Sequence, residues 1–122
     1  MQLDMGLCRD VLLYIEEEGG VDGIKQFPKI KNQDEKLIFY QIKKMSEAGY
    51  VNYSNPGKST RSEYEHFTAE ITFYGHEFLK QMLDDTLWNK TKDIAAKKGM
   101  SLTFETVKAI IPVAIQSLIS SM

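Results

Sequence analysis

The sequence contains few of the residues that stabilise small secreted proteins or bind metal ions. Its 122 residues include one cysteine, two histidines, three prolines and one tryptophan. A single cysteine cannot form an intramolecular disulfide, and Cys8 falls on the apolar side of a predicted helix. We therefore expect a buried thiol in a reducing compartment, in a chain long enough to fold without disulfides or metal ions.

Long hydrophobic runs are also absent. The most apolar stretch, AIIPVAIQSLI at residues 109–119, is roughly half the ~20 residues that a membrane-spanning helix needs, and Pro112 and Gln116 interrupt it. The first residues lack the basic segment and apolar run of a secretory signal. We expect a cytoplasmic protein without membrane contact.

Helical spacing, capping residues and turn residues predict an α+β protein that is mostly helical. In chain order, the predicted elements are a helix from an N-cap at Asp4 to Glu18, an edge strand or connector at 21–33, a helix at 34–49 capped by Asp34 or Asn32, a hairpin of strands 50–54 and 66–73 around a polar loop at 55–65, and helices at 74–98 (interrupted) and 103–120. This order is that of a winged-helix domain without its usual short second helix. We expect a single domain over residues 1–122, with a winged-helix-like core at 1–73 and a helical extension at 74–122.

Residues 75–85, GHEFLKQMLDD, gather several titratable side chains and invite comparison with a metal or acid/base site. At 100° per residue, His76 lies about 80° from Asp84, whereas Glu77 and Asp84 share a face with Lys80 between them. A zincin motif would need a second histidine where the chain has Lys80. We predict a solvated ion-pair ladder here, with no metal site.

The aspartates of this stretch have a structural explanation. The apolar face of the predicted helix turns by roughly a quarter turn or more before it resumes near Trp88, so one straight helix cannot bury both stripes. Asp84, Asp85 and Thr86 are all residue types that cap helices. We predict a break between two helices, with Asp85 or Thr86 as the cap of the second.

Catalytic motifs are weak throughout the chain. GKST at residues 57–60 resembles the end of a phosphate-binding loop, but Asn52 stands where that motif needs glycine and a polar loop follows instead of a helix. No serine or cysteine nucleophile lies near His66 or His76 in the sequence. We expect no enzymatic activity, no cofactor and no small-molecule substrate.

The distribution of charge is more informative than the net charge of −2. Residues 24–62 contain eight basic and three acidic side chains, a local balance of +5, so the rest of the chain carries −7. This window includes the second predicted helix and the polar loop of the hairpin. A DNA-binding surface and an ordinary solvated surface both fit this pattern, and five net charges would support only modest, salt-dependent binding unless the protein dimerises.

Basic and aromatic side chains share the predicted outer face of the helix at 34–49, opposite Ile38, Ile42 and Met45. The loop at 55–65 adds further basic and hydroxyl side chains that could contact phosphate oxygens. The predicted DNA contacts are Lys36, Tyr40, Lys43, Lys44, Lys58 and Arg61.

Apolar side chains cover about half the circumference of the last predicted helix, more than one core contact needs. We expect part of this face to contact a second copy of the chain or another protein. The predicted contact residues are Ile110, Ile111, Ile115, Leu118 and Ile119.

Several stretches resemble a family of small, functionally uncharacterised proteins found largely in bacterial prophages and phages. The matching stretches are LDMGLCRDVLLYIEE (3–17), YQIKKMSEAGYV (40–51), ITFYGHEFLKQMLDDTLWNKTK (71–92) and SLTFETVK (101–108). The resemblance implies a winged-helix-like fold and a bacterial or phage source, and it carries over no catalytic residue. SEAGYV at 46–51 also resembles the end of the recognition helix in small bacterial repressors.

Together these observations favour a winged-helix module that binds double-stranded DNA through the helix at 34–49 and the loop at 55–65. The alternative is a protein-interaction module that uses the same fold only as a scaffold and binds a phage or host protein.

Overall fold

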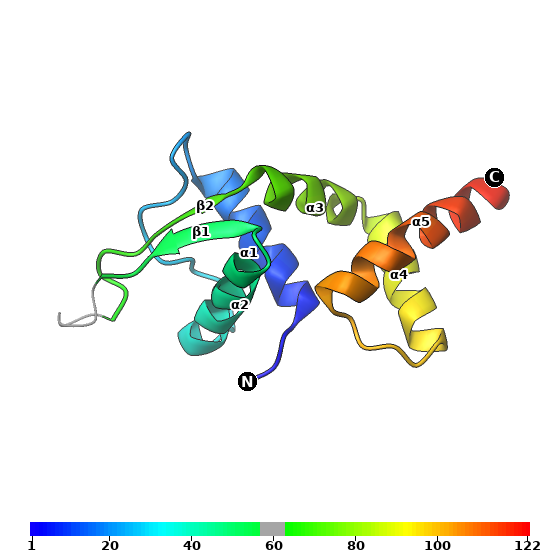
Figure 1. Ribbon diagram of the computed structural model, residues 1–122, viewed down its shortest axis with the longest axis horizontal. Coiled ribbons are helices and arrows are strands. Elements are labelled where there is room, and N and C mark those ends of the chain that lie inside the picture. The colour runs from blue at the N-terminus through cyan, green and yellow to red at the C-terminus, as the bar shows by residue number, and fades with distance from the viewer. Residues whose placement is uncertain (57–62) are drawn as a thin grey trace. The chain divides into compact units, whose positions relative to one another are not determined.

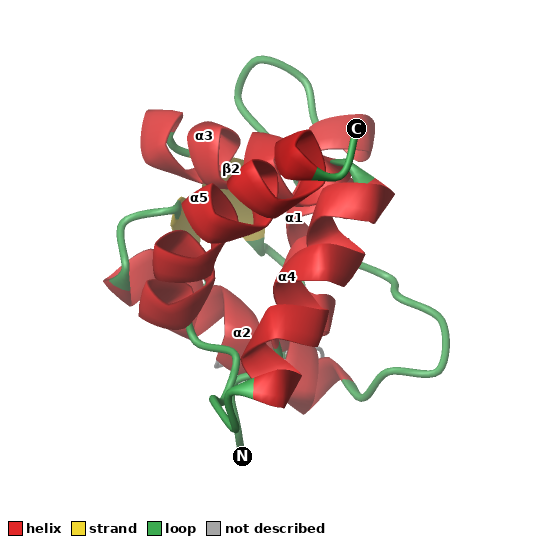
Figure 2. Ribbon diagram, turned by 90° about the vertical axis from the view of Figure 1, so that its right-hand side faces the viewer, coloured by secondary structure: helices red, strands yellow, loops and turns green. Residues whose placement is uncertain are grey.

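The computed structural model of the chain describes residues 1–56 and 63–122 (Figure 1). Its elements, in chain order, are α1 (Met5–Glu18), α2 (Glu35–Glu47), β1 (Val51–Ser54), β2 (Thr68–Ile71), α3 (Phe73–Leu83), α4 (Asp85–Lys97) and α5 (Phe104–Ser120). Figure 2 shows that helices make up most of the described chain and that the strands form a small sheet. The predicted α+β, mostly helical class is confirmed.

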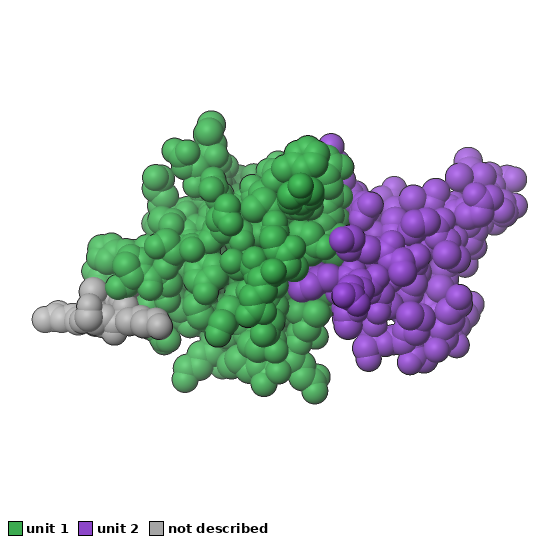
Figure 3. Space-filling view, in the orientation of Figure 1, with its two compact units in different colours: residues 1–78 green, residues 79–122 purple. Residues whose placement is uncertain are grey.

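The chain divides into two compact units, Met1–Phe78 and Leu79–Met122 (Figure 3). The boundary drawn from the sequence, after residue 73, lies before this division, which falls inside α3. The first turns of α3 belong to the first unit because they pack on the chain that leaves α2. The ring of Phe78 stacks on Tyr50 with centroids 4.7 Å apart, and a Cβ on Gly75 would collide with the Tyr50 carbonyl.

The first two helices begin and end at residues that the sequence identifies. A carboxylate oxygen of Asp4 accepts a hydrogen bond from the Leu7 amide at 3.0 Å, and one of Asp34 accepts from the Lys36 amide at 2.8 Å. After α2, Gly49 adopts a φ of +86°, the left-handed conformation that ends many helices. Both N-caps and the end of the second helix are therefore confirmed.

The hairpin is antiparallel, with Val51 opposite Ile71 and Ser54 opposite Thr68. Of the two alternatives for residues 21–33, an edge strand or a connector, the structure has a connector that pairs with the hairpin through one antiparallel bridge. The Ile24 amide donates to the Ala69 carbonyl at 2.8 Å, and the Ala69 amide donates back at 3.1 Å. The order helix, bridge, helix and hairpin is consistent with a winged-helix-like arrangement.

The core of the first unit lies where α1, α2 and the hairpin meet. Val11, Leu12, Ile38, Ile42 and Phe67 have no exposed surface, which places the apolar stripes of both helices against one another and against the sheet. Burying five large side chains this way fixes the orientation of α2 relative to the hairpin.

The second unit pairs α4 with α5, and the break before α4 is confirmed. The residue predicted to cap α4 is wrong: Asp84, and not Asp85 or Thr86, accepts a hydrogen bond from the Leu87 amide at 2.9 Å. One carboxylate oxygen of Asp84 is therefore used to cap α4. Trp88 is 4% exposed and anchors α4.

None of the helices in the described part of the chain is long and apolar enough to cross a membrane.

Candidate nucleic-acid interface

The outer face of α2 presents two lysines with uncompensated charge. Lys36 and Lys43 are both exposed, and neither forms an ion pair with any residue in 1–56 or 63–122. They are seven residues apart on the helix, so their side chains lie within about 20° of one another. These two ammonium groups are therefore placed on one face and are available to an anionic partner.

Lys44 and Tyr40 lie beside this face, and the Lys44 ammonium has contacts within the helix. The Lys44 ammonium is 3.1 Å from a carboxylate oxygen of Glu47 and 5.4 Å from the centroid of the Tyr40 ring. Tyr40 is half-buried. The charge of Lys44 is thus partly compensated inside the helix, so Lys44 offers less to a phosphate than Lys36 or Lys43 does.

The two predicted contacts of the hairpin loop, Lys58 and Arg61, lie outside the described residues. The structure therefore brings together four of the six predicted DNA contacts, all of them on α2.

An aromatic cluster fixes the hairpin against α2. The ring of Phe39 meets Tyr53 at a centroid distance of 5.5 Å and Tyr64 at 5.6 Å. Tyr64 in turn stacks on Phe27 at 4.0 Å, and Phe27 meets the buried ring of Phe67 at 4.9 Å. Aromatic pairs at these separations are favourable beyond their buried area, so α2 and the hairpin are held as one surface.

Gln41 is a buried polar residue of α2 that the sequence did not single out. Its amide nitrogen donates to the Gln2 carbonyl at 3.0 Å, and its amide oxygen accepts from the Asp4 backbone amide at 2.8 Å. The Cys8 thiol lies 3.5 Å from the same oxygen. A polar residue among the apolar positions of α2 was the available signal, and its bonds tie α2 to the start of α1.

Burial raises the pKa of the Cys8 thiol to about 12, with the nearby Asp4 carboxylate as the second cause. The side chain has no exposed surface. The predicted buried thiol is confirmed, and it is the un-ionised form that packs against Gln41.

The sequence profile of a family described as "Hypothetical protein (DUF2513)" matches residues 2–101. This chain belongs to the DUF2513 family. An uncharacterized protein of Haemophilus influenzae is 25% identical over 122 residues, which cover 100% of this chain and 98% of that protein. No solved structure matches the chain significantly. The predicted resemblance to an uncharacterised family is confirmed, and the family description names no activity.

The profile of DUF2513 covers α1 to α4 and stops before α5. The predicted contact residues of α5 fall into two groups. Ile110 and Ile111 are only 5% and 2% exposed, so they pack inside the protein and are not free to meet a partner. Ile115 and Ile119 are 42% and 56% exposed, and Leu118 is half-buried.

The titratable residues of GHEFLKQMLDD do not converge in this DUF2513 protein. His76 pairs through Nδ1 with a carboxylate oxygen of Glu16 at 3.2 Å, on the surface between α1 and α3. Within residues 1–56 and 63–122, no three histidine, cysteine or acidic side chains are arranged to hold a metal ion.

Proposed function

We propose that this protein is a cytoplasmic, non-enzymatic module that binds double-stranded DNA. In this proposal α2 lies in or near the major groove and the loop at 55–65 approaches the sugar-phosphate backbone. The buried, un-ionised thiol of Cys8 suits a reducing compartment.

The observation that carries the proposal is the state of Lys36 and Lys43. Both ammonium groups are exposed, lie on one face of a helix that is fixed by the aromatic cluster, and have no described ion-pair partner. Phosphate binding by such lysines releases condensed counterions from DNA, which is the main source of sequence-independent affinity. Tyr40 beside them adds a side chain that can contact phosphate or base edges.

The surroundings of two reactive groups support the non-enzymatic part of the proposal. His76 contacts a carboxylate on the surface instead of a hydroxyl or thiol that it could activate. The Cys8 thiol is buried, and its raised pKa disfavours the thiolate that nucleophilic chemistry needs.

The resemblance to phage and prophage proteins suggests a regulatory role in such an element. The end of α2, SEAGYV, supports this view through its likeness to small repressors.

Fluorescence anisotropy with a labelled 20-base-pair duplex, at low and moderate salt, tests the proposal. We expect the parent protein to bind with strong salt dependence and Lys36→Ala/Lys43→Ala to bind at least ~10-fold more weakly. Lys97→Ala/Lys98→Ala, at the C-terminal end of α4, removes the same charge and should keep the parent affinity. Absence of salt-sensitive binding by the parent to any duplex, including the DNA upstream of its own gene, would overturn the proposal.

A second candidate function, binding of another protein or a second copy, is favoured by the exposed apolar side chains of α5. Val113, Ile115 and Ile119 are 50%, 42% and 56% exposed, and no charged residue follows Lys108 in the sequence. Light scattering distinguishes self-association from a strict monomer. A pull-down that returns one stoichiometric protein, with DNA binding absent, would favour this second function over the first.

A further inference from the structure

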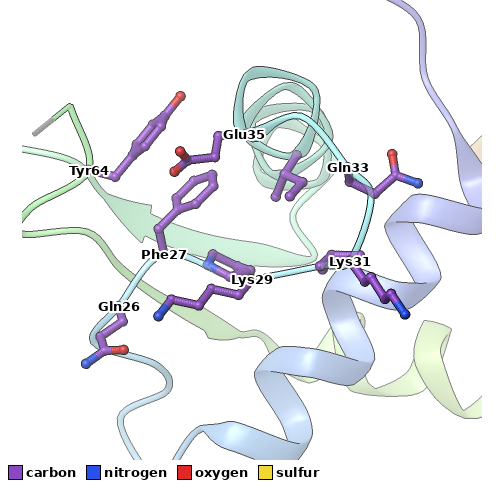
Figure 4. Close-up of a pocket in the computed structure, with 10 residues that line it drawn as sticks. Gln26, Phe27, Lys29, Lys31, Gln33, Glu35 and Tyr64 are labelled. Carbon is purple, nitrogen blue, oxygen red and sulfur yellow. The ribbon is translucent and has the colours of Figure 1, made fainter.

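A groove of about 580 Å³ lies in the first unit, between residues 26–33 and the N-terminal end of α2 (Figure 4). The connector at 26–33 stands in chain order where a winged-helix domain has its short second helix. The groove therefore lies beside the N-terminal end of α2, the helix whose outer face carries Lys36 and Lys43.

The base of the groove is apolar and fixed. Phe27 is 8% exposed and Ile38 is fully buried, and both line the groove. Phe27 stacks on Tyr64 with the ring planes 17° apart, so Tyr64 is held at the wall of the groove. Burial raises the pKa of its hydroxyl, and the carboxylates of Glu63, Glu35 and Asp34 raise it further.

The rim carries hydrogen-bond donors of the kinds that contact phosphate and sugar. Lys29 and Lys31 are exposed, and in the described part of the chain neither has an ion-pair partner. Gln26 and Gln33, at the two ends of residues 26–33, also line the groove. In Figure 4 the ammonium groups of Lys29 and Lys31 point to different sides, so each can reach a different phosphate.

The placement of these lysines follows from the chain around them. Pro28 is buried and Ile30 is half-buried, whereas Lys29 and Lys31 between and after them are exposed. The connector therefore exposes two cations to solvent while its apolar residues line the groove.

One acidic side chain, Glu35, also lines the groove. As the first residue of α2 it interacts favourably with the positive end of the helix dipole. It would repel a phosphate, as would the carboxylates of Asp34 and Glu63 near Tyr64, so a bound strand must follow the connector, where Lys29 and Lys31 lie.

We propose that this groove holds one sugar-phosphate strand of duplex DNA, with Lys29 and Lys31 contacting its phosphates. The inference rests on the proposed function and adds a second contact element to it. The connector then positions the duplex at the N-terminal end of α2, while the face with Lys36 and Lys43 meets the groove of the DNA.

The test measures the dependence of log affinity on log salt for the full chain and 20-base-pair duplexes of several sequences. For Lys29→Ala/Lys31→Ala we expect the magnitude of the slope to fall by about 1.8, because each lost phosphate contact removes about 0.9. The ratio of affinities between duplexes should stay within about twofold of the parent ratio, because backbone contacts carry little sequence information.

Two controls separate this effect from a general loss of charge. Lys25 precedes residues 26–33 in the chain but lines a different hollow, with Glu18 and Asp22. The salt dependence of binding by Lys25→Ala should therefore match that of the parent. Lys97→Ala/Lys98→Ala matches the charge change of the double variant and should also keep the parent slope. Glu35→Gln should tighten binding severalfold at low salt.

The outcomes distinguish the two proposals. If the parent binds DNA and Lys36→Ala/Lys43→Ala weakens it, but Lys29→Ala/Lys31→Ala keeps the parent slope, the groove proposal alone is overturned. If the parent binds no duplex at any salt concentration, both proposals are overturned. An equal loss of slope in Lys97→Ala/Lys98→Ala would also overturn the groove proposal, because the effect would then be unspecific.

Discussion

Among the described residues, the polar side chains of Gln41 in the first unit and Thr91 in the second are completely buried, and they are satisfied in different ways. Gln41 bonds to backbone groups of Gln2 and Asp4, 39 and 37 residues away in the chain. Thr91 donates to the Leu87 carbonyl at 2.8 Å, one turn earlier in its own helix. The first unit thus uses its buried polar group to join two helices, whereas the buried polar group of the second bonds within its own helix.

The surroundings of several lysine side chains also differ between the two units. In the first unit, Lys29, Lys31, Lys36 and Lys43 are exposed without described ion-pair partners. In the second, Lys97 pairs with Asp93 at 3.2 Å, and several apolar side chains of α5 are exposed. This contrast assigns phosphate binding to the first unit and apolar contact to the second in our proposals.

Replacing Gln41 should show the largest effect. Gln41→Ala leaves the Asp4 amide and the Gln2 carbonyl without their partner and opens a cavity between α1 and α2, so we expect a loss of about 2–4 kcal/mol in the free energy of unfolding. Urea denaturation followed by circular dichroism measures it.

Thr91→Val is the matched control in the second unit. The Leu87 carbonyl keeps its place in the helix, so the change should cost less than about 1 kcal/mol. Equal costs for the two variants would contradict the contrast between the units.

The Cys8 thiol predicts a pH dependence that belongs to the first unit. In the unfolded chain the thiol loses its proton near its ordinary pKa, but in the folded protein it keeps the proton up to about pH 12. Between these values the folded state binds more protons, so stability falls as pH rises, with a slope approaching 1.4 kcal/mol per pH unit. The loss between pH 9 and 11 should be about 2–3 kcal/mol.

Cys8→Ala serves as the reference for that measurement, because lysines and tyrosines also titrate at high pH. The difference in unfolding free energy between parent and Cys8→Ala should shrink by the stated amount from pH 9 to 11. A constant difference would mean that the thiol ionises freely in the folded protein.

Removing the cap of α4 should lower the free energy of unfolding less than Gln41→Ala or the ionisation of Cys8 does. Asp84→Ala removes the acceptor of the Leu87 amide and should cost about 1 kcal/mol. Asp85→Ala removes a first-turn carboxylate that does not cap the helix and should cost less than Asp84→Ala. Thermal melts of both variants measure the two costs. A larger loss of stability in Asp85→Ala than in Asp84→Ala would support Asp85 as the cap, as the sequence analysis predicted.

The site was only partly predictable from the sequence. Helical spacing placed Lys36, Tyr40, Lys43 and Lys44 on one side of α2, but it could not show that Glu47 compensates Lys44. That difference depends on rotamers within the helix. The groove beside residues 26–33 had no sequence signal beyond its lysines, since its walls come from segments far apart in the chain.

The sequence by itself determined where α1 and α2 begin and where α2 ends, because caps such as Asp4 and Asp34 and the left-handed Gly49 act over a few residues. Only the tertiary structure decided the rest. It reduced the candidate edge strand to one bridge at Ile24 and buried Ile110 among the core residues. These outcomes depend on partners that are distant in sequence, and burial and long-range hydrogen bonds exist only once those partners have met.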